Sequence, residues 1–137
     1  DPYPVNRRFF RTKTFKRLKL ESLLVAGMEL RDNGTTALVY LTREMIRQVG
    51  ASERDMDNIS GFVGQIEGVK NGVTLEETED GHVKISLRTD PGDLNATAVC
   101  ALLGGGGHAA AAGAMAEGTM AEVRQAVIHA MEQVRGS

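Results

Sequence analysis

The run Gly104-Gly-Gly-Gly-His108-Ala-Ala-Ala-Ala-Gly113-Ala114 decides how the rest of this chain is organised. It has almost no side-chain volume to bury, so its role must depend on the backbone. Consecutive glycines allow positive φ angles and let another molecule approach the main chain. Their N–H groups can converge on an anion, and His108 stands where an imidazole can donate to a phosphate or transfer a proton. We therefore predict an anion-binding loop, followed by a short helix because alanine favours helix.

A plain flexible connector with a surface histidine is the alternative interpretation of this run. The run is compact and uninterrupted, whereas flexible linkers usually mix glycine with serine. It is not the G-x-G-x-x-G of a dinucleotide-binding fold, and no Gly-Lys-Ser/Thr follows it as in a P-loop. These differences favour a loop that binds a phosphate-sized anion in another way.

A strand with a polar face precedes the glycine run. Apolar residues at positions 83, 85 and 87 alternate with Lys84, Ser86 and Arg88. A period of two places these three polar side chains on one face of a strand. A hydroxyl beside two cations suits phosphate recognition, although the solvent face of an ordinary hairpin shows the same alternation.

The composition indicates one ordinary globular domain. The chain has 137 residues, of which 42% are hydrophobic and 25% charged, and its net charge is −2. That charge argues against a protein that coats nucleic acid through charge alone. The single cysteine, Cys100, excludes an internal disulfide and fits the core of a cytoplasmic protein. No apolar run approaches the roughly 20 residues that cross a bilayer, and no signal-peptide pattern begins the chain.

Hydrophobic periodicity and turn residues predict an α+β fold of the α/β layer type. Asn33-Gly34 is a strong hairpin signal, Thr42 and Thr119 are helix caps, and Asp93 is expected to cap the helix before the glycine run. In the first long helix, Phe15 and Leu18 are expected on the apolar side. We predict a mixed or antiparallel sheet of about four or five strands flanked by helices. The expected helices cover residues 5–10, 14–28, 42–49, 52–66, 94–103 and 119–135, and the expected strands cover 28–31, 35–41, 73–78 and 82–89.

Three of these features occur in an order that resembles the DHHA1 domain of the DHH phosphoesterase superfamily. They are the strand Lys84-Ile-Ser-Leu-Arg88, the helix that begins Leu94-Asn-Ala-Thr-Ala-Val-Cys, and the motif Gly104-Gly-Gly-Gly-His108-x-x-Ala-Ala-Gly113. The sequence is most similar to the bacterial nanoRNase type, which combines oligoribonuclease and phosphoadenosine-phosphate (PAP) phosphatase activities. The resemblance extends over nearly the whole chain.

The resemblance implies a division of labour between two domains. Residues 1–13 would end an interdomain linker, and residues 14–137 would form the substrate-binding DHHA1 domain. An N-terminal DHH domain, absent from this chain, would hold two manganese ions, so the chain alone is expected to bind no metal and to be inactive. The chain begins at Asp1-Pro2 without a methionine, which we interpret as the start of an excised part. The full-length protein could form a homodimer.

The resemblance also implies roles for individual residues. Gly104, Gly105, Gly106, Gly107 and His108 would contact the substrate phosphate near the metals, with His108 in a supporting catalytic role. Ser86 and Arg88 would hold the more distant phosphate or the base. The family commonly has a basic or bulky residue among the two positions after the histidine, whereas this chain has Ala109 and Ala110.

Two other functions share this domain type. A cyclic-dinucleotide phosphodiesterase would use the same two domains, and a non-catalytic RNA- or tRNA-binding module occurs at the end of alanyl-tRNA synthetases. An RNA-binding module is expected to show a broad basic surface. The net charge of −2 and the compact glycine loop favour a short oligonucleotide or a nucleotide as the ligand.

Overall fold

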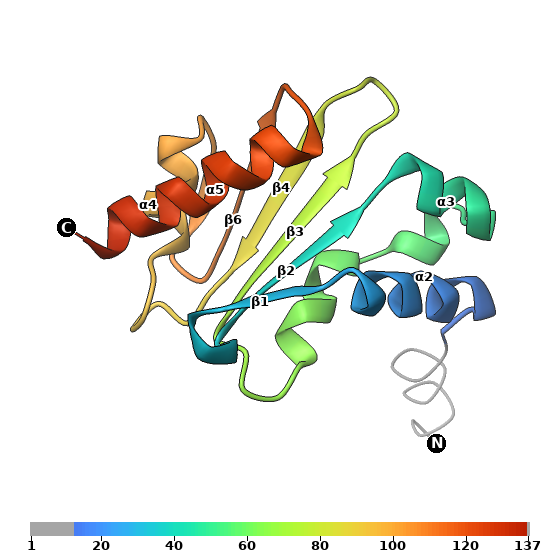
Figure 1. Ribbon diagram of the computed structural model, residues 1–137, viewed down its shortest axis with the longest axis horizontal. Coiled ribbons are helices and arrows are strands. Elements are labelled where there is room, and N and C mark those ends of the chain that lie inside the picture. The colour runs from blue at the N-terminus through green and yellow to red at the C-terminus, as the bar shows by residue number, and fades with distance from the viewer. Residues whose placement is uncertain (1–12, 137) are drawn as a thin grey trace, which may run out of the picture.

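A six-stranded mixed sheet forms the centre of the protein in this computed structural model, which describes residues 13–136. The strands lie in the order β1-β2-β3-β4-β6-β5 (Figure 1). Strands β2 and β3 are parallel, and every other neighbouring pair is antiparallel. The strands are β1 (Glu29–Arg31), β2 (Thr36–Leu41), β3 (Asn71–Glu77), β4 (Val83–Arg88), β5 (Gly106–His108) and β6 (Ala111–Ala116).

Helices cover both faces of this sheet. Figure 1 shows α4 (Ala96–Leu102) and α5 (Met120–Arg135) on one side, with α2 (Phe15–Ala26) and α3 (Arg43–Val49) on the other. Two short 3₁₀ segments, η2 (Arg54–Met56) and η3 (Ile59–Gln65), follow α3, and a third, η1 (Asp32–Gly34), turns the chain between β1 and β2. The predicted α+β class is confirmed, with one strand more than the upper number expected.

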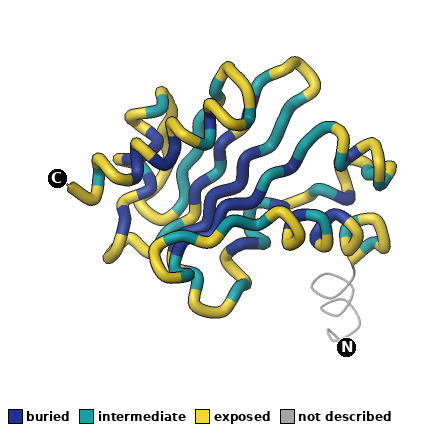
Figure 2. Tube along the Cα trace, in the orientation of Figure 1, coloured by how far each residue is buried: buried dark blue, intermediate teal, exposed yellow. Residues whose placement is uncertain are grey.

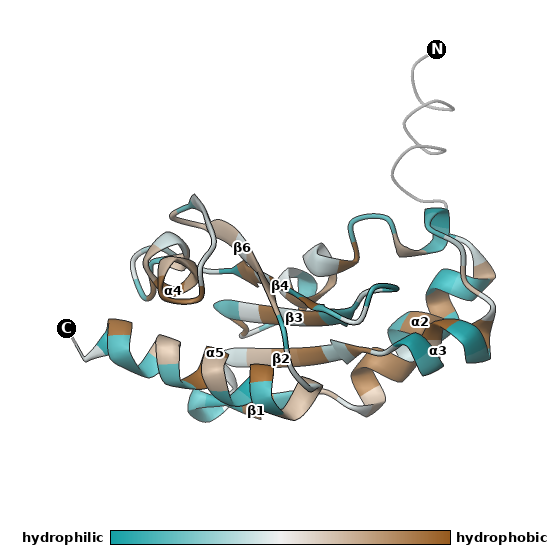
Figure 3. Ribbon diagram, turned by 90° about the horizontal axis from the view of Figure 1, so that it is seen from above, coloured by the Kyte–Doolittle hydropathy of each residue, from teal (hydrophilic) through white to brown (hydrophobic). Residues whose placement is uncertain are grey.

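Each side of the sheet has its own apolar cluster, because side chains alternate between the faces of a strand. Leu38, Val73 and Ile85 pack with α4 and α5, whereas Ala37 and Val39 pack with α2, α3 and η3. The central strands are therefore the most deeply buried part of the chain (Figure 2), and apolar residues concentrate there between the helices (Figure 3). Cys100 lies in the first cluster, as predicted.

The predicted helix after the glycine run is wrong, because Ala109 and Ala110 form a turn and Ala111 and Ala112 begin strand β6. All six residues of β6 pair with β4, from Val83↔Ala116 to Arg88↔Ala111. Ala112, Ala114 and Ala116 also pack against the apolar cluster below α4 and α5. This pairing and burial outweigh the intrinsic preference of alanine for helix, which is about 0.5 kcal/mol per residue.

The predicted helix over residues 52–66 is also wrong. The segment forms η2 and η3, which are separated at Asn58, whose φ of 53° lies in the left-handed region. Asp93 does not cap α4; the Asn95 side chain does, by accepting a hydrogen bond from the Ala98 N–H. The Asp93 carboxylate instead accepts from the Asn71 amide at 2.7 Å.

Other predictions near the ends of elements have mixed outcomes. The hairpin at Asn33-Gly34 and the caps at Thr42 and Thr119 are confirmed. Phe15 and Leu18 are exposed, so the prediction that they lie on the packed apolar side of α2 is wrong. The predicted helix over residues 5–10 lies outside the described residues. Between residues 13 and 136, no helix has the length and apolar character required to span a membrane.

Candidate anion-binding site

Strand register gathers the polar residues singled out in the sequence onto one face of the sheet. Arg88 of β4 pairs with Ala111 of β6, which in turn pairs with His108 of β5. In the same way Ser86 pairs with Gly113, which pairs with Gly106. Directly opposed residues of antiparallel strands point to the same side. Two adjacent rows of one sheet face, called the site face below, therefore carry Arg88, His108, Ser86 and Gly106.

The site face is open at β4, β6 and β5. On β2 and β3 the same face is covered by α2, α3 and η3, and this cover ends beside Arg88. There a hollow of about 300 Å³ lies between the sheet and η3, with Ser60, Ser86, Arg88, Gly106 and Gly113 among its lining residues. The segment η3 can lie so close because Gly72 has no side chain; a Cβ at Gly72 would stand 2.2 Å from Cγ2 of Val63.

The charge of Arg88 is not neutralised within residues 13–136. Its guanidinium donates at 3.4 Å to Oδ1 of Asn58 and at 3.4 Å to Oγ of Ser60, both of which are neutral. No carboxylate of the described chain forms an ion pair with it. A planar guanidinium held by weak neutral acceptors keeps its attraction for an anion that offers two oxygens, such as a phosphate.

Asn58 and Ser60 are neighbours of the site that the sequence did not indicate. The sequence pattern predicts a continuous helix over residues 52–66, in which nothing distinguishes these two residues from surface residues. The left-handed conformation of Asn58 ends η2 and turns η3 towards the sheet. A small polar residue that tolerates positive φ was the only available signal.

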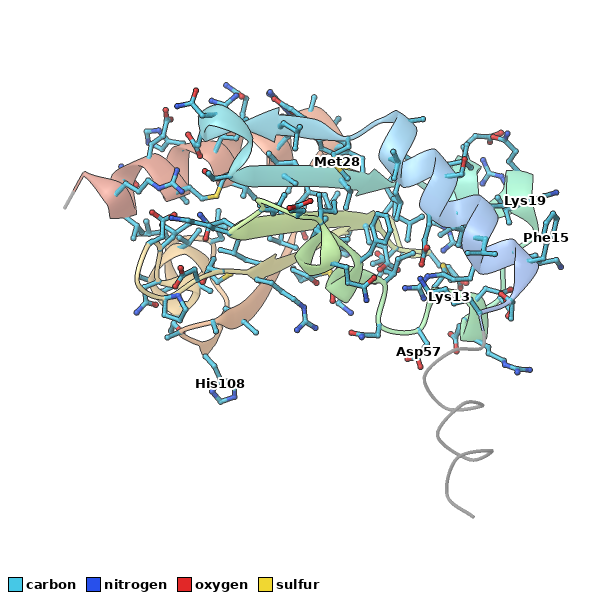
Figure 4. All side chains as sticks on the ribbon, turned by 90° about the horizontal axis from the view of Figure 1, so that it is seen from below. Lys13, Phe15, Lys19, Met28, Asp57 and His108 are labelled. Atoms are coloured by element: carbon cyan, nitrogen blue, oxygen red, sulfur yellow. The ribbon has the colours of Figure 1, made fainter. Side chains whose placement is uncertain are left out.

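His108 and Ser86 are free to bind a ligand. The imidazole of His108 forms no hydrogen bond or ion pair in the part of the chain that the structure describes, and the side chain points away from the body of the protein (Figure 4). The Ser86 hydroxyl likewise has no partner among these residues. Together with Arg88 they supply one cation, one hydroxyl and one imidazole to the same open surface.

The four glycines do different things. The N–H groups of Gly104 and Gly105 bind the carbonyls of Ala101 and Cys100 at the end of α4, at 3.2 and 2.8 Å, so they do not form the predicted open nest. A Cβ at Gly107, whose φ is +147°, would stand 2.6 Å from Cα of Ala112. At Gly106 the φ angle is not positive and a Cβ would meet no atom within 4 Å. Of the four consecutive glycines, Gly106 and Gly107 line the hollow and Gly104 and Gly105 do not. Ligand contact by the four glycines stays a prediction.

The sequence profile of the DHHA1 domain family matches residues 33–135 of this chain. The chain belongs to that family. This confirms the resemblance to the DHHA1 domain of DHH-superfamily phosphoesterases that the strand and glycine motifs indicated. The matched range contains every residue of the site face described above.

Two curated relatives of this DHHA1 domain carry the same description. The bifunctional oligoribonuclease and PAP phosphatase NrnA of Thermus thermophilus is 37% identical over 97 residues, which are 71% of this chain and 28% of the relative. The probable NrnA of Streptococcus mutans is 27% identical over 100 residues, which are 73% of this chain and 31% of the relative. The chain therefore spans less than a third of the length of these relatives.

A solved structure shares the fold of the DHHA1 domain closely. The exopolyphosphatase-related protein from Bacteroides fragilis superposes with a TM-score of 0.86 and 26% identity, covering 99% of this chain and 40% of that protein. Nearly all of the arrangement described here therefore recurs within a larger protein.

Metal-binding residues are not clustered in the described DHHA1 domain. No group of three or more His, Cys, Asp or Glu side chains between residues 13 and 136 is placed to hold a metal ion. These residues do not fit the manganese centre that the resemblance implies, and we assign that centre to none of them.

Proposed function

We propose that this chain is the substrate-binding domain of a phosphoesterase that hydrolyses short oligoribonucleotides or nucleotide phosphates such as PAP. The observation that carries the proposal is the uncompensated guanidinium of Arg88 in one row with His108 and beside Ser86, on an open sheet face. The descriptions of the two curated relatives support the substrate class.

Each residue of the site face has a part in binding a phosphate. Arg88 offers two parallel N–H donors, which match two phosphate oxygens. The Ser86 hydroxyl, one step along the same face of β4, can donate to a third oxygen. His108 can donate a ring N–H from the opposite side of the row. The backbone at Gly106 lets the ligand approach the sheet without meeting a side chain.

Hydrolysis itself would belong to a DHH domain of the full-length protein. A manganese centre in that domain would supply the activated water, as the resemblance implies. The part of the present chain is to bind and orient the phosphate for that centre. We expect such a protein to be cytoplasmic, and a homodimer is compatible with the proposal.

A binding titration of this chain tests the proposal. We would measure the affinity for adenosine 5′-monophosphate (AMP), PAP and a ribodinucleotide with a 5′-phosphate, for the parent chain and for Arg88→Ala. Loss of a charged, bidentate contact is expected to weaken binding about 10- to 100-fold. Arg47→Ala is the matched control, because Arg47 is exposed on α3 and within residues 13–136 its side chain pairs with Glu44 alone; it should leave the affinity unchanged.

Three outcomes would contradict the proposal. Equal affinities of the parent and Arg88→Ala for all three ligands would remove Arg88 from the binding site. Tighter binding to a structured RNA hairpin, with a steep salt dependence, would make the chain an RNA-binding module instead. A marked preference for a cyclic dinucleotide over the linear ligands would favour the cyclic-dinucleotide phosphodiesterase.

A further inference from the structure

One strongly exposed apolar side chain lies on the site face. Met115 of β6 is 56% exposed, and the other large apolar side chains that are comparably exposed in residues 13–136 lie on α2, α4 or the edge strand β1. Met115 is two residues along the strand from Gly113 and four from Ala111, so all three point to the same face. An exposed thioether beside a candidate phosphate site suits a ligand that has both a phosphate and an apolar group.

The surface between Met115 and Arg88 is almost free of side chains. Ser86, Gly113 and Gly106 form a row between them, here called the strip. A Cβ at Gly106 would meet no atom within 4 Å, so internal packing does not require glycine there. At the covered end of the same row, opposite Ser86, Thr74 is buried and its hydroxyl has no hydrogen-bond partner in the described part of the chain. The strip therefore combines backbone free of side chains with the unpaired hydroxyl of Ser86, and the buried Thr74 hydroxyl lies at its covered end.

The dimensions of the strip suit one nucleotide. At about 3.4 Å per residue, Gly113 lies about 7 Å from both Ala111 and Met115 along β6. A ligand phosphate beside Arg88 and His108 thus leaves its sugar over the strip and its base near Met115. Flat aromatic rings such as nucleobases pack well on the polarisable sulfur of methionine.

The Met115 end of the strip is a poor site for a second phosphate. Lys84 pairs with Met115 across β4 and β6, but Glu76 of β3 pairs with Lys84 from the other side. The carboxylate of Glu76 offsets the positive charge of Lys84 on this row. A neutral, planar group fits this end better than an anion does.

We propose that Met115 contacts the base of the nucleotide whose phosphate is held by Arg88 and Ser86. The inference rests on the proposed function, because it needs the phosphate at Arg88. It adds a reason why the domain would prefer a nucleoside phosphate to a sugar phosphate, since only the former carries a base to reach Met115.

Two ligands that differ by the base alone test this inference. Affinities for AMP and for ribose 5-phosphate are measured with the parent chain, Met115→Ala, Arg88→Ala and Leu102→Ala. Met115→Ala should weaken AMP binding about three- to tenfold and leave ribose 5-phosphate within twofold of the parent. Leu102 is 55% exposed on α4, across the sheet from the site face, so Leu102→Ala should change neither ligand.

The methyl signal of Met115 gives a second readout that does not depend on affinity. The chain has six methionines, and Met115→Ala removes one of six ε-methyl signals from the carbon–proton NMR spectrum, which assigns it. In the parent chain this signal should move upfield when AMP is added, through the ring current of the base, and stay in place with ribose 5-phosphate.

The outcomes separate this inference from the proposed function. If Arg88→Ala weakens both ligands while Met115→Ala weakens neither and its methyl signal does not move, the inference is wrong and the proposed function stands. If Arg88→Ala weakens neither ligand, the proposed function is wrong and the inference falls with it.

Discussion

Arg88 and His108 flank Ala111 in a single row of the sheet, each paired with that alanine from a different side. Neighbouring strands lie about 4.8 Å apart, which puts the two backbones about 10 Å apart. Both side chains are long enough to reach a phosphate that sits above Ala111, whose methyl group leaves room for it. The row therefore brings a residue of β4 and one 20 positions later in the chain within reach of a single anion.

A double-mutant cycle tests whether Arg88 and His108 bind the same phosphate. Affinities for ribose 5-phosphate are measured for the parent chain, Arg88→Ala, His108→Ala and the double variant. Residues that share a ligand should show a coupling of about 0.5–3 kcal/mol, so the combined loss is smaller than the sum of the single losses. Losses that add within about 0.3 kcal/mol would place the two residues at separate sites.

The sequence predicted those features of the site that depend on a single strand or helix. The alternation of Lys84, Ser86 and Arg88 sets their common face in any strand, and the structure confirms it. The meeting of Arg88 with His108 was not derivable in this way, because it depends on the register of β6 between β4 and β5. Only the resemblance to the DHHA1 family had suggested that these residues share one ligand.

Glycines 106 and 107 should respond in opposite ways to the same substitution. Gly107→Ala forces a Cβ into Ala112 at a positive φ, so the free energy of unfolding should fall by about 2 kcal/mol or more. Gly106→Ala meets no atom within 4 Å and should leave stability nearly unchanged, but its methyl group enters the hollow and should weaken AMP binding. Urea unfolding and an AMP titration measure the two effects.

Two results would contradict this assignment of the glycines. A strongly destabilised Gly106→Ala would show that this residue is restricted by packing after all. Parent-like AMP affinity in a stable Gly106→Ala would show that the ligand does not approach the backbone there.

The alanine run shows where propensity fails as a guide. Alanine is the strongest helix former, and nothing inside residues 109–112 opposes a helix. The strand forms because β4 offers a complete ladder of partners and the small alanines fit below α4 and α5. The strand partner β4 lies more than 20 residues before the run, and the contacts with α4 and α5 depend on the tertiary fold, so a local pattern could not reveal either cause.

Glu29 should make the stability of the protein depend on pH in the acid range. Its carboxylate accepts from Nε of Arg124 at 2.8 Å and from the Tyr40 hydroxyl at 2.6 Å, which joins β1 to α5. These bonds lower the pKa of Glu29 to about 2. The unfolded carboxyl has a pKa near 4.3, so the stabilisation is complete above about pH 4.3 and is lost as the pH falls towards 2.

Glu29→Gln measures that contribution. At pH 7 the variant should be less stable than the parent by about 1–3 kcal/mol, and the difference should narrow below pH 4. Glu44→Gln, which removes an exposed pair with Arg47 on α3, is the control and should change stability little at any pH. A pH-independent difference for Glu29→Gln would show that the ionised carboxylate does not supply the stability.

Two buried threonines should give opposite results when the hydroxyl is replaced by a methyl group. Thr74 is 2% exposed and its hydroxyl is unpaired, whereas Thr36 is 0% exposed and donates to Oδ2 of Asp32 at 2.8 Å. An unpaired buried hydroxyl costs about 1–3 kcal/mol, and valine has almost the same shape. Thr74→Val should therefore raise the free energy of unfolding by about 1 kcal/mol, and Thr36→Val should lower it by about 1 kcal/mol. Urea unfolding of both variants measures the two changes in stability. A loss of stability in Thr74→Val as large as in Thr36→Val would show that the Thr74 hydroxyl has a partner in solution. The Ser86 hydroxyl, directly opposite on β4, would then be the nearest candidate in the row.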